Sequence, residues 1–282
     1  MKIVRAFPRK TKATPCDDLA FTGIPTRKDF QKAESVNEVH VSVTFTYDIP
    51  KAELMGEKWI KAGFNVKIGG PAYGDRMSES FIPGLYIKQE GYTFTSRGCP
   101  NSCWFCSVWE SAKGKLIELP ITPGWNILDD NILATSEQHF RDVIQMLKQQ
   151  PDKPIFTGGI EAKILKPWQA ELMKEVKTKR LYCAYDTPDD YEPLVEAGKM
   201  FRSAGFTTAS HVLSCYVLIG YWGDTFLKAE KRLVETIKAG FVPYAMLWKD
   251  KSGTVDEDWR RFQREWCRPQ IVGVKMRDYA TN

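Results

Sequence analysis

The sequence predicts an α/β fold, a partial TIM-like (β/α)6 barrel at 91–282 behind a small N-terminal α/β cap at 1–90. Runs of β-branched and aromatic residues alternate with helical patterns in the second region, which favours parallel strands joined by right-handed crossovers. A closed barrel of eight such units needs about 250 residues, and only six units fit here. An open doubly wound sheet is the alternative for the same alternation.

The cap is predicted to be a reduced Rossmann-like βαβ unit. Two apolar patches at 3–7 and 19–24 lie among prolines and charges, so we expect irregular chain there with at most one strand. The pattern that follows predicts a strand, a helix and a second, parallel strand at 39–47, 51–62 and 64–68.

The barrel elements follow in regular order from residue 91. Strands are predicted at 92–96, 126–128, 155–157, 181–185, 214–219 and 241–248. Helices are predicted at 136–149, 167–177, 189–204 and 224–238, and a last helix opens at a capping box formed by Thr254 and Glu257. Ligands of such sheets bind at the carboxyl ends of the strands, so the residues there form the candidate site.

Composition places the chain among ordinary globular proteins. Of its 282 residues 43% are hydrophobic and 27% charged, which excludes disordered, collagen-like and coiled-coil classes. No apolar run approaches the roughly 18 residues of a membrane-spanning helix, and the N-terminus lacks the apolar core of a secretory signal. We therefore expect no membrane partner and a cytoplasmic location. The net charge of +5 is smaller than that of a dedicated nucleic-acid binder.

Three of the seven cysteines stand close together. Cys99, Cys103 and Cys106 form the spacing C-x3-C-x2-C, whereas the other four are isolated. Structural zinc sites usually take four protein ligands, and the chain has no second C-x2-C pair. Three thiolates suit three irons of a cubane [4Fe–4S] cluster and leave the fourth iron open for a non-protein ligand. A three-cysteine zinc site or three unrelated thiols are the alternatives. Cys183 and Cys215 lie in predicted strands and are expected in the core.

The trio follows a strand and carries an aromatic residue before its last cysteine, and in this it resembles the motif of the radical S-adenosylmethionine (SAM) superfamily. The resemblance covers about residues 91–250, and the whole chain is similar to uncharacterised radical SAM proteins of bacteria and phages. It implies that the amino and carboxylate groups of SAM chelate the open iron. It also implies that an electron, delivered by a donor such as flavodoxin or ferredoxin, cleaves SAM to methionine and a 5′-deoxyadenosyl radical that abstracts hydrogen from the substrate.

Two stretches compete for the contact with the SAM amino group. Gly158, Gly159 and Glu161 resemble the glycine-glycine-glutamate motif of the family, but an isoleucine is inserted and they follow the third strand. Physically, the glycines let backbone approach a ligand and the carboxylate accepts from an ammonium. The second strand ends in the alternative stretch, which consists of Asp129, Asp130 and Asn131.

Further strand ends carry single candidates. The resemblance implies that Asp186 holds the SAM ribose, with a helix cap as the alternative, and that backbone at Gly220 contacts the adenine, with a plain buried strand as the alternative. Arg97 precedes the cysteine loop, where tuning of the cluster, binding of the SAM carboxylate and a plain salt bridge stay open. Met246, near the end of the sixth strand, is expected to pack in the core rather than on adenine.

The remaining features leave the substrate open. Residues 66–71 resemble a late strand of the cobalamin-binding domain of some radical SAM proteins, but 1–90 is too short for such a domain and lacks its histidine motif, so cobalamin is not expected. The basic N-terminus and the arginines of the last helix favour a nucleic acid or nucleotide, although a solvated helix face explains the arginines as well; they are Arg260, Arg261, Arg264 and Arg268. A peptide or metabolite is also compatible. A non-enzymatic iron–sulfur or zinc sensor is the alternative function.

Overall fold

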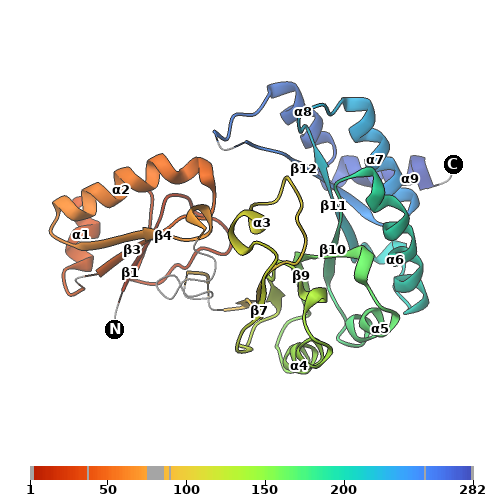
Figure 1. Ribbon diagram of the computed structural model, residues 1–282, viewed down its shortest axis with the longest axis horizontal. Coiled ribbons are helices and arrows are strands. Elements are labelled where there is room, and N and C mark those ends of the chain that lie inside the picture. The colour runs from red at the N-terminus through yellow and green to blue at the C-terminus, as the bar shows by residue number, and fades with distance from the viewer. Residues whose placement is uncertain (1–2, 37, 75–85, 89, 251, 281–282) are drawn as a thin grey trace.

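The computed structural model describes residues 3–36, 38–74, 86–88, 90–250 and 252–280. Two parallel sheets, each with its own helices, and a small two-stranded antiparallel sheet make up the described chain (Figure 1). The first sheet belongs to the N-terminal part of the chain and the second to the remainder. Together they give the mixed α/β architecture that the sequence predicts.

The N-terminal sheet has four strands in the order β2-β1-β3-β4, all paired in parallel. Their bounds are Val4–Phe7 for β1, Ala20–Thr22 for β2, Glu38–Ser42 for β3 and Asn65–Gly69 for β4. Helices α1 and α2 span Arg27–Ala33 and Ile49–Lys61. The predicted βαβ unit is confirmed. The expectation for the first thirty residues is wrong, because both apolar patches form strands; such short strands gain their stability from cross-strand neighbours, which local sequence does not reveal.

The order of this sheet reverses between β1 and β3. From β1 the chain moves outward to β2, then returns to the other side of β1 and continues through β3 and β4. A reversal of this kind leaves a crevice outside the carboxyl ends of the two central strands, where open α/β sheets bind ligands.

Aromatic rings fill the N-terminal core. The Trp59 side chain of α2 is fully buried and meets the rings of Phe21, Phe30 and Phe64 edge-on at centroid distances of 5.5, 5.0 and 5.0 Å. Edge-to-face contacts are the favoured geometry of such pairs. The helix is therefore fixed to the sheet by a single large side chain and its aromatic neighbours.

The second sheet has six parallel strands in the order β12-β11-β10-β9-β8-β5. Its strands follow one another across the sheet in chain order, so every crossover runs in the same direction. Right-handed crossovers then place the connecting helices on one face, and Figure 1 shows α4 to α7 along the outside of the sheet. The strands are Tyr92–Thr93, Asn126–Ile127, Ile155–Ile160, Arg180–Tyr185, Leu213–Ile219 and Val242–Leu247.

Three helices of this region begin at a residue whose side chain accepts a hydrogen bond from the first turn, namely α4, α7 and α8. Ser136 accepts a hydrogen bond from the His139 N–H at the start of α4, as predicted. The last predicted helix is capped by Asp256 rather than by Thr254, and the sequence-based prediction overlooked a further helix, α9. The helices are Glu137–Lys148 (α4), Pro167–Glu175 (α5), Tyr191–Ser203 (α6), Phe226–Lys238 (α7), Glu257–Glu265 (α8) and Pro269–Ala280 (α9).

Cys183 and Cys215 lie side by side on β10 and β11 and are fully buried, which confirms their assignment to the core. Short 3-10 turns follow several strands, at Thr46–Asp48, Pro71–Tyr73, Ile132–Ala134, Ala162–Ile164 and Pro188–Asp190, and another lies between α6 and β11, at Thr208–Ser210. Among the helices of the described residues, none combines the length and apolar character needed to cross a bilayer.

A small hairpin departs from the predicted strand at 92–96. After the two residues of β5 the chain leaves the large sheet, and β6 (Ser96–Gly98) pairs antiparallel with β7 (Leu116–Glu118). The cysteine loop and helix α3 (Ser107–Ala112) lie between these two strands. The hairpin therefore closes the base of the loop that carries the three cysteines.

Candidate cofactor site

The cysteine loop begins at a glycine that no other residue can replace without strain. Gly98 has a φ of +92°, and a Cβ placed on it would lie 2.1 Å from the carbonyl oxygen of Lys115, directly before the paired strand β7. Cys99, Cys103 and Cys106 follow it, each partly exposed and none in a disulfide. The loop thus holds three free thiols at the carboxyl edge of the large sheet, next to β5.

The thiols influence one another electrostatically. Burial raises the pKa of Cys99, and burial raises the pKa of Cys103 to about 11, with the neighbouring Cys106 and Cys99 adding to the shift. The charges of Asp186 and Asp190 act on Cys103 in the same direction. Binding to a metal removes such thiol protons, because the thiolate is the ligand.

The donor set fits an iron–sulfur cluster. In the part of the chain that the structure describes, no three His, Cys, Asp or Glu side chains converge as they would around a single metal ion. The ligands of a cubane cluster converge at a wider spacing than those of a single ion, because each cysteine thiolate binds its own iron. Three thiolates on one loop, without imidazole or carboxylate, are ligands typical of iron–sulfur chemistry.

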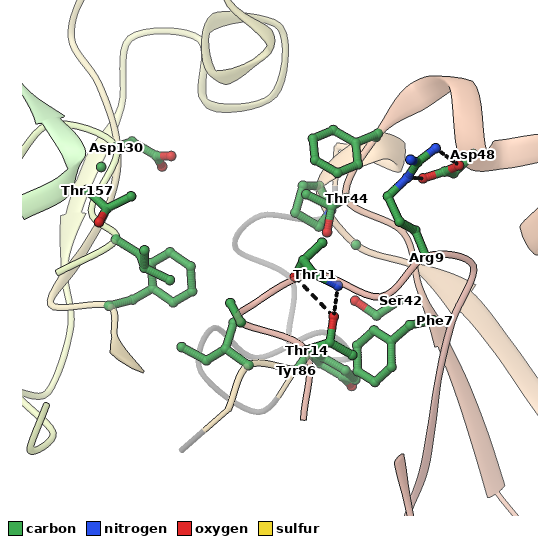
Figure 2. A pocket seen from close by; sticks show the side chains of 18 of the residues that line it. Phe7, Arg9, Thr11, Thr14, Ser42, Thr44, Asp48, Tyr86, Asp130 and Thr157 are labelled. Atoms are coloured by element: carbon green, nitrogen blue, oxygen red, sulfur yellow. Dashed lines mark hydrogen bonds and ion pairs between the residues drawn. The ribbon is translucent and has the colours of Figure 1, made fainter. Parts of the chain in front are cut away.

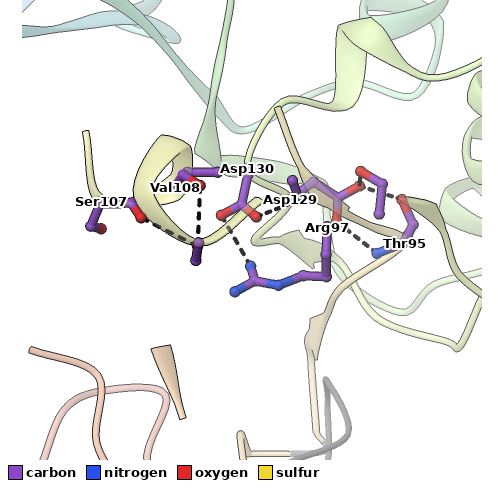
Figure 3. Close-up of polar contacts among 9 residues, drawn as sticks. Thr95, Arg97, Ser107, Val108, Asp129 and Asp130 are labelled. Carbon is purple, nitrogen blue, oxygen red and sulfur yellow. Dashed lines mark hydrogen bonds and ion pairs between the residues drawn. The ribbon is translucent and has the colours of Figure 1, made fainter. Parts of the chain in front are cut away.

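Asp130 and Arg97 hold the base of the loop (Figure 3). The Asp130 carboxylate accepts from the Gly98 N–H at 2.8 Å and from Arg97 Nη1 at 3.1 Å, and both side chains are almost wholly buried. The Arg97 guanidinium lies 4.3 Å from the centroid of the Phe94 ring. Of the roles considered for Arg97, the structure shows the salt bridge.

Asp129 anchors the chain just before the loop. Its buried carboxylate accepts from the Thr95 N–H at 2.6 Å, the Thr95 hydroxyl at 2.5 Å and the Ser96 hydroxyl at 2.8 Å. Burial raises its pKa, and these hydrogen bonds oppose the shift. Because both carboxylate oxygens are engaged, the geometry favours support of the loop over the SAM contact predicted for Asp129.

The Asn131 amide joins the two stretches that compete in the sequence. Its Nδ2 donates to Cys99 Sγ at 3.4 Å and to Glu161 Oε2 at 2.5 Å. Its Oδ1 is buried and accepts no hydrogen bond from the described residues. The structure therefore brings a cysteine of the loop, a carboxylate after β9 and an amide acceptor into one small polar site.

Gly158 and Gly159 lie inside β9, whereas the sequence predicted a strand that ends at residue 157. The register between β9 and β10 shifts at this point, between Leu181 and Cys183. A Cβ on Gly158 would lie 1.9 Å from the Asp129 carbonyl oxygen, and Gly159 has a φ of +108° with open space around it. The irregular backbone explains the prediction's error: the strand continues past the glycine pair, and Ile160 pairs with Cys183 beyond the register shift.

Asp186 and Gly220 end the next two strands as predicted. The Asp186 N–H donates to Asp190 Oδ2 at 2.9 Å, and burial, with the charge of Asp190, raises the pKa of Asp186 to about 7. Gly220 has a φ of +71°, its N–H donates to Asp224 Oδ2 at 2.9 Å, and a Cβ there would lie 2.6 Å from Leu247 Cδ1. Gly220 thus has a structural reason for its residue type, whereas the hydrogen bond at Asp186 uses only its backbone.

Aromatic contacts connect the loop with the far strand ends, a feature that sequence reasoning missed. The Trp104 ring lies 5.5 Å from that of Tyr221 and 6.5 Å from that of Trp248, measured between centroids. These residues follow β11 and β12, so the loop reaches across the carboxyl edge of the sheet. The aromatic residues in both segments were the sequence feature that could have indicated this contact.

A cavity of about 660 Å³ lies between the carboxyl edges of the two sheets. Figure 2 shows Asp130 and Thr157 on one side of it and Thr11, Ser42 and Thr44 on the other. Met246 lines it and is 41% exposed, so the expectation that this side chain packs in the core is wrong. Sequence reasoning missed the contribution of the N-terminal sheet to this cavity.

Comparison with known proteins does not assign the chain to a family. No family model and no curated protein matches the sequence.

Proposed function

We propose that the protein is a radical SAM enzyme whose [4Fe–4S] cluster is held by Cys99, Cys103 and Cys106. The observation that carries this proposal is the contact of Asn131 with both Cys99 and Glu161. A cluster beside a carboxylate and an unused amide acceptor is the environment that an amino acid cofactor with an ammonium group needs. When bound, the cluster supplies the electron that cleaves SAM into methionine and a 5′-deoxyadenosyl radical.

The proposal includes a partial (β/α)6 barrel as the architecture of the large sheet. Sequential strand order and helices along one face support it, because a barrel wall winds in this way whereas a doubly wound sheet reverses direction. The contacts of Trp104 with Tyr221 and Trp248 also support it, since they connect the start of the sheet with its far end. An incomplete wall leaves a side through which a substrate enters.

Each candidate residue has a proposed task. Glu161 and Asn131 Oδ1 accept from the SAM ammonium, while backbone at Gly158 and Gly159 passes close to the cofactor. Asp130, together with Arg97, keeps the loop in place through its contact with the Gly98 N–H. The remaining contacts of SAM, with its ribose and adenine, are assigned to the strand ends at Asp186 and Gly220.

Anaerobic reconstitution with iron and sulfide tests the proposal. We expect Cys103→Ala to lose cluster assembly and SAM cleavage, because a thiolate ligand of iron is removed. The matched control is Cys16→Ala, which removes an exposed cysteine of the N-terminal sheet region. The measurements are iron and acid-labile sulfide per chain and the release of 5′-deoxyadenosine under reducing conditions.

The outcomes separate the two functional classes. Iron and sulfide in the control together with 5′-deoxyadenosine support the enzyme. One zinc per chain without sulfide, or a cluster that never cleaves SAM, contradicts it and favours a metal-binding or sensing protein. A Cys103→Ala protein that keeps its full cluster contradicts the assignment of the ligands.

A further inference from the structure

The cavity described above opens at the reversal point of the N-terminal sheet. Phe7 ends β1 and is followed directly by Pro8 and Arg9, and Ser42 and Thr44 lie at and beyond the end of β3. These are the two strands between which the strand order reverses, and a crevice at such a point is where open α/β sheets bind ligands. The cavity thus lies between the carboxyl edges of both sheets, where ligands of such sheets bind.

Most of its wall is apolar and partly aromatic. Phe7 and Phe45 contribute from β1 and the chain after β3, and the other side is formed by Met246 of β12 together with residues that directly follow β5 and β8, Phe94 and Leu128. Hydroxyl groups of Ser42, Thr44 and Thr157 are spaced among them. Small-molecule sites have this character, with an apolar enclosure and a few polar groups that orient the ligand. A flat heteroaromatic ring fits such an environment better than a strongly hydrated group does.

A second hollow, of about 370 Å³, adjoins the first and is basic. Lys10 and Lys51 line it together with Thr22 and Gly23, and it shares Arg9 and Asp48 with the large cavity. Three cations therefore face one carboxylate, so the hollow keeps a positive charge. Lys10 and Lys51 are exposed, which leaves their ammonium groups available to an anion from solution.

Arg9 stands at the boundary of the two hollows and is held in position. Its Nε and Nη2 donate to the two carboxylate oxygens of Asp48 at 2.8 and 2.9 Å, and its guanidinium lies 5.2 Å from the centroid of the Tyr47 ring. This contact uses one edge of the planar guanidinium. A guanidinium fixed in this way is pre-organised to donate to a phosphate with its remaining hydrogens.

We propose that the two hollows together bind a nucleoside monophosphate, with the base in the apolar cavity and the phosphate in the basic hollow at Arg9, Lys10 and Lys51. The opposite wall of the cavity carries Asp130 and Gly158, which belong to the candidate cofactor site. A ligand bound here lies next to that site. The inference that the nucleotide is the substrate of the enzyme therefore rests on the proposed function. The binding itself rests only on the two hollows.

Isothermal titration calorimetry on the full reconstituted chain tests the binding, with AMP, GMP, CMP and UMP, their nucleosides and inorganic phosphate as probes. We expect at least one monophosphate to bind about tenfold or more tightly than its own nucleoside, because a charge-assisted hydrogen bond is lost with the phosphate. We also expect it to bind more tightly than inorganic phosphate, which leaves the apolar cavity empty. Failure of all four monophosphates to bind, or equal affinity for nucleoside and monophosphate, overturns the inference.

Variants locate the two halves of the site. Lys10→Gln combined with Lys51→Gln is expected to weaken the monophosphate about tenfold and the nucleoside hardly at all. The matched control is Lys58→Gln combined with Lys61→Gln, which removes two exposed lysines from the other end of α2. Thr44→Trp places a large ring in the cavity and should weaken both probes. Equal effects of the two lysine pairs, or unchanged binding in Thr44→Trp, overturn the assigned positions.

The same titrations on Cys103→Ala separate this inference from the proposed function. Binding that persists in this variant while the wild-type chain cleaves SAM supports both. A chain that cleaves SAM but binds no monophosphate overturns the nucleotide inference alone. A wild-type chain that binds the monophosphate but assembles no cluster overturns the enzyme assignment and leaves the nucleotide site intact.

Discussion

The Asn131 side chain shows how one amide can define a site. Its two Nδ2 hydrogens serve Cys99 and Glu161, which leaves Oδ1 as a buried acceptor that receives no hydrogen bond from the described residues. The sequence identified Asn131 and Glu161 as members of two alternative stretches for the same task. It could not show that they touch, because they are thirty positions apart and their meeting depends on how β8 and β9 pair.

Asn131→Ala is expected to leave cluster assembly intact and to lower the reduction potential of the cluster. The reason is that a hydrogen bond to a ligating sulfur stabilises the reduced, more negative state. A redox titration followed by electron paramagnetic resonance measures the potential independently of activity. Gln138→Ala, which removes an exposed amide on α4, is the control and should leave the potential unchanged. An unaltered potential in Asn131→Ala would show that the contact with Cys99 Sγ does not act on the cluster.

At the scale of elements, regular helices and strands were predictable and irregular ones were not. Helix α4 has a periodic apolar pattern and a clear cap, and strand β11 has a continuous apolar run. The structure places both elements where the sequence predicts them. The hairpin of β6 and β7 escaped prediction because its pairing joins two short segments across the cysteine loop. The candidate site was therefore predictable at its motif and at the strand ends, but not in the hairpin that supports it.

Gly98→Ala tests the role of that hairpin. The substitution puts an L side chain at positive φ, which costs about 1–3 kcal/mol, and also forces Cβ against the Lys115 carbonyl, so β6 and β7 must separate. We expect loss of most iron incorporation. Gly23→Ala is the control, because it has a φ of +80° but open space around its Cβ and therefore isolates the backbone strain. Equal iron content in the two variants would mean that the hairpin does not position the cysteines.

At the scale of the molecule, the chain has two separate clusters of buried apolar side chains, one under each sheet. The cavity lies between the carboxyl edges of these sheets, so a ligand in it would contact both. Sequence patterns predicted the boundary near residue 90 but gave no sign that the first strands face the later ones, because the relative placement of two sheets depends on contacts between side chains far apart in sequence. The candidate ligand site therefore lies between the two parts of the chain that the predicted boundary separates.

Trp59→Ala tests whether the two clusters unfold independently. Truncation of this fully buried ring removes its contacts with Phe21, Phe30 and Phe64 and should destabilise the N-terminal sheet by about 3–5 kcal/mol. Hydrogen exchange followed by mass spectrometry should show faster exchange in β1, β3 and β4 while β10 and β11 stay protected, because local stability follows local packing. Phe140→Ala, in the core of the large sheet, is the reciprocal control and should affect β8 and β9 instead. Uniform loss of protection over both sheets in either variant would show one cooperative unit, and the boundary near residue 90 would then have no thermodynamic meaning.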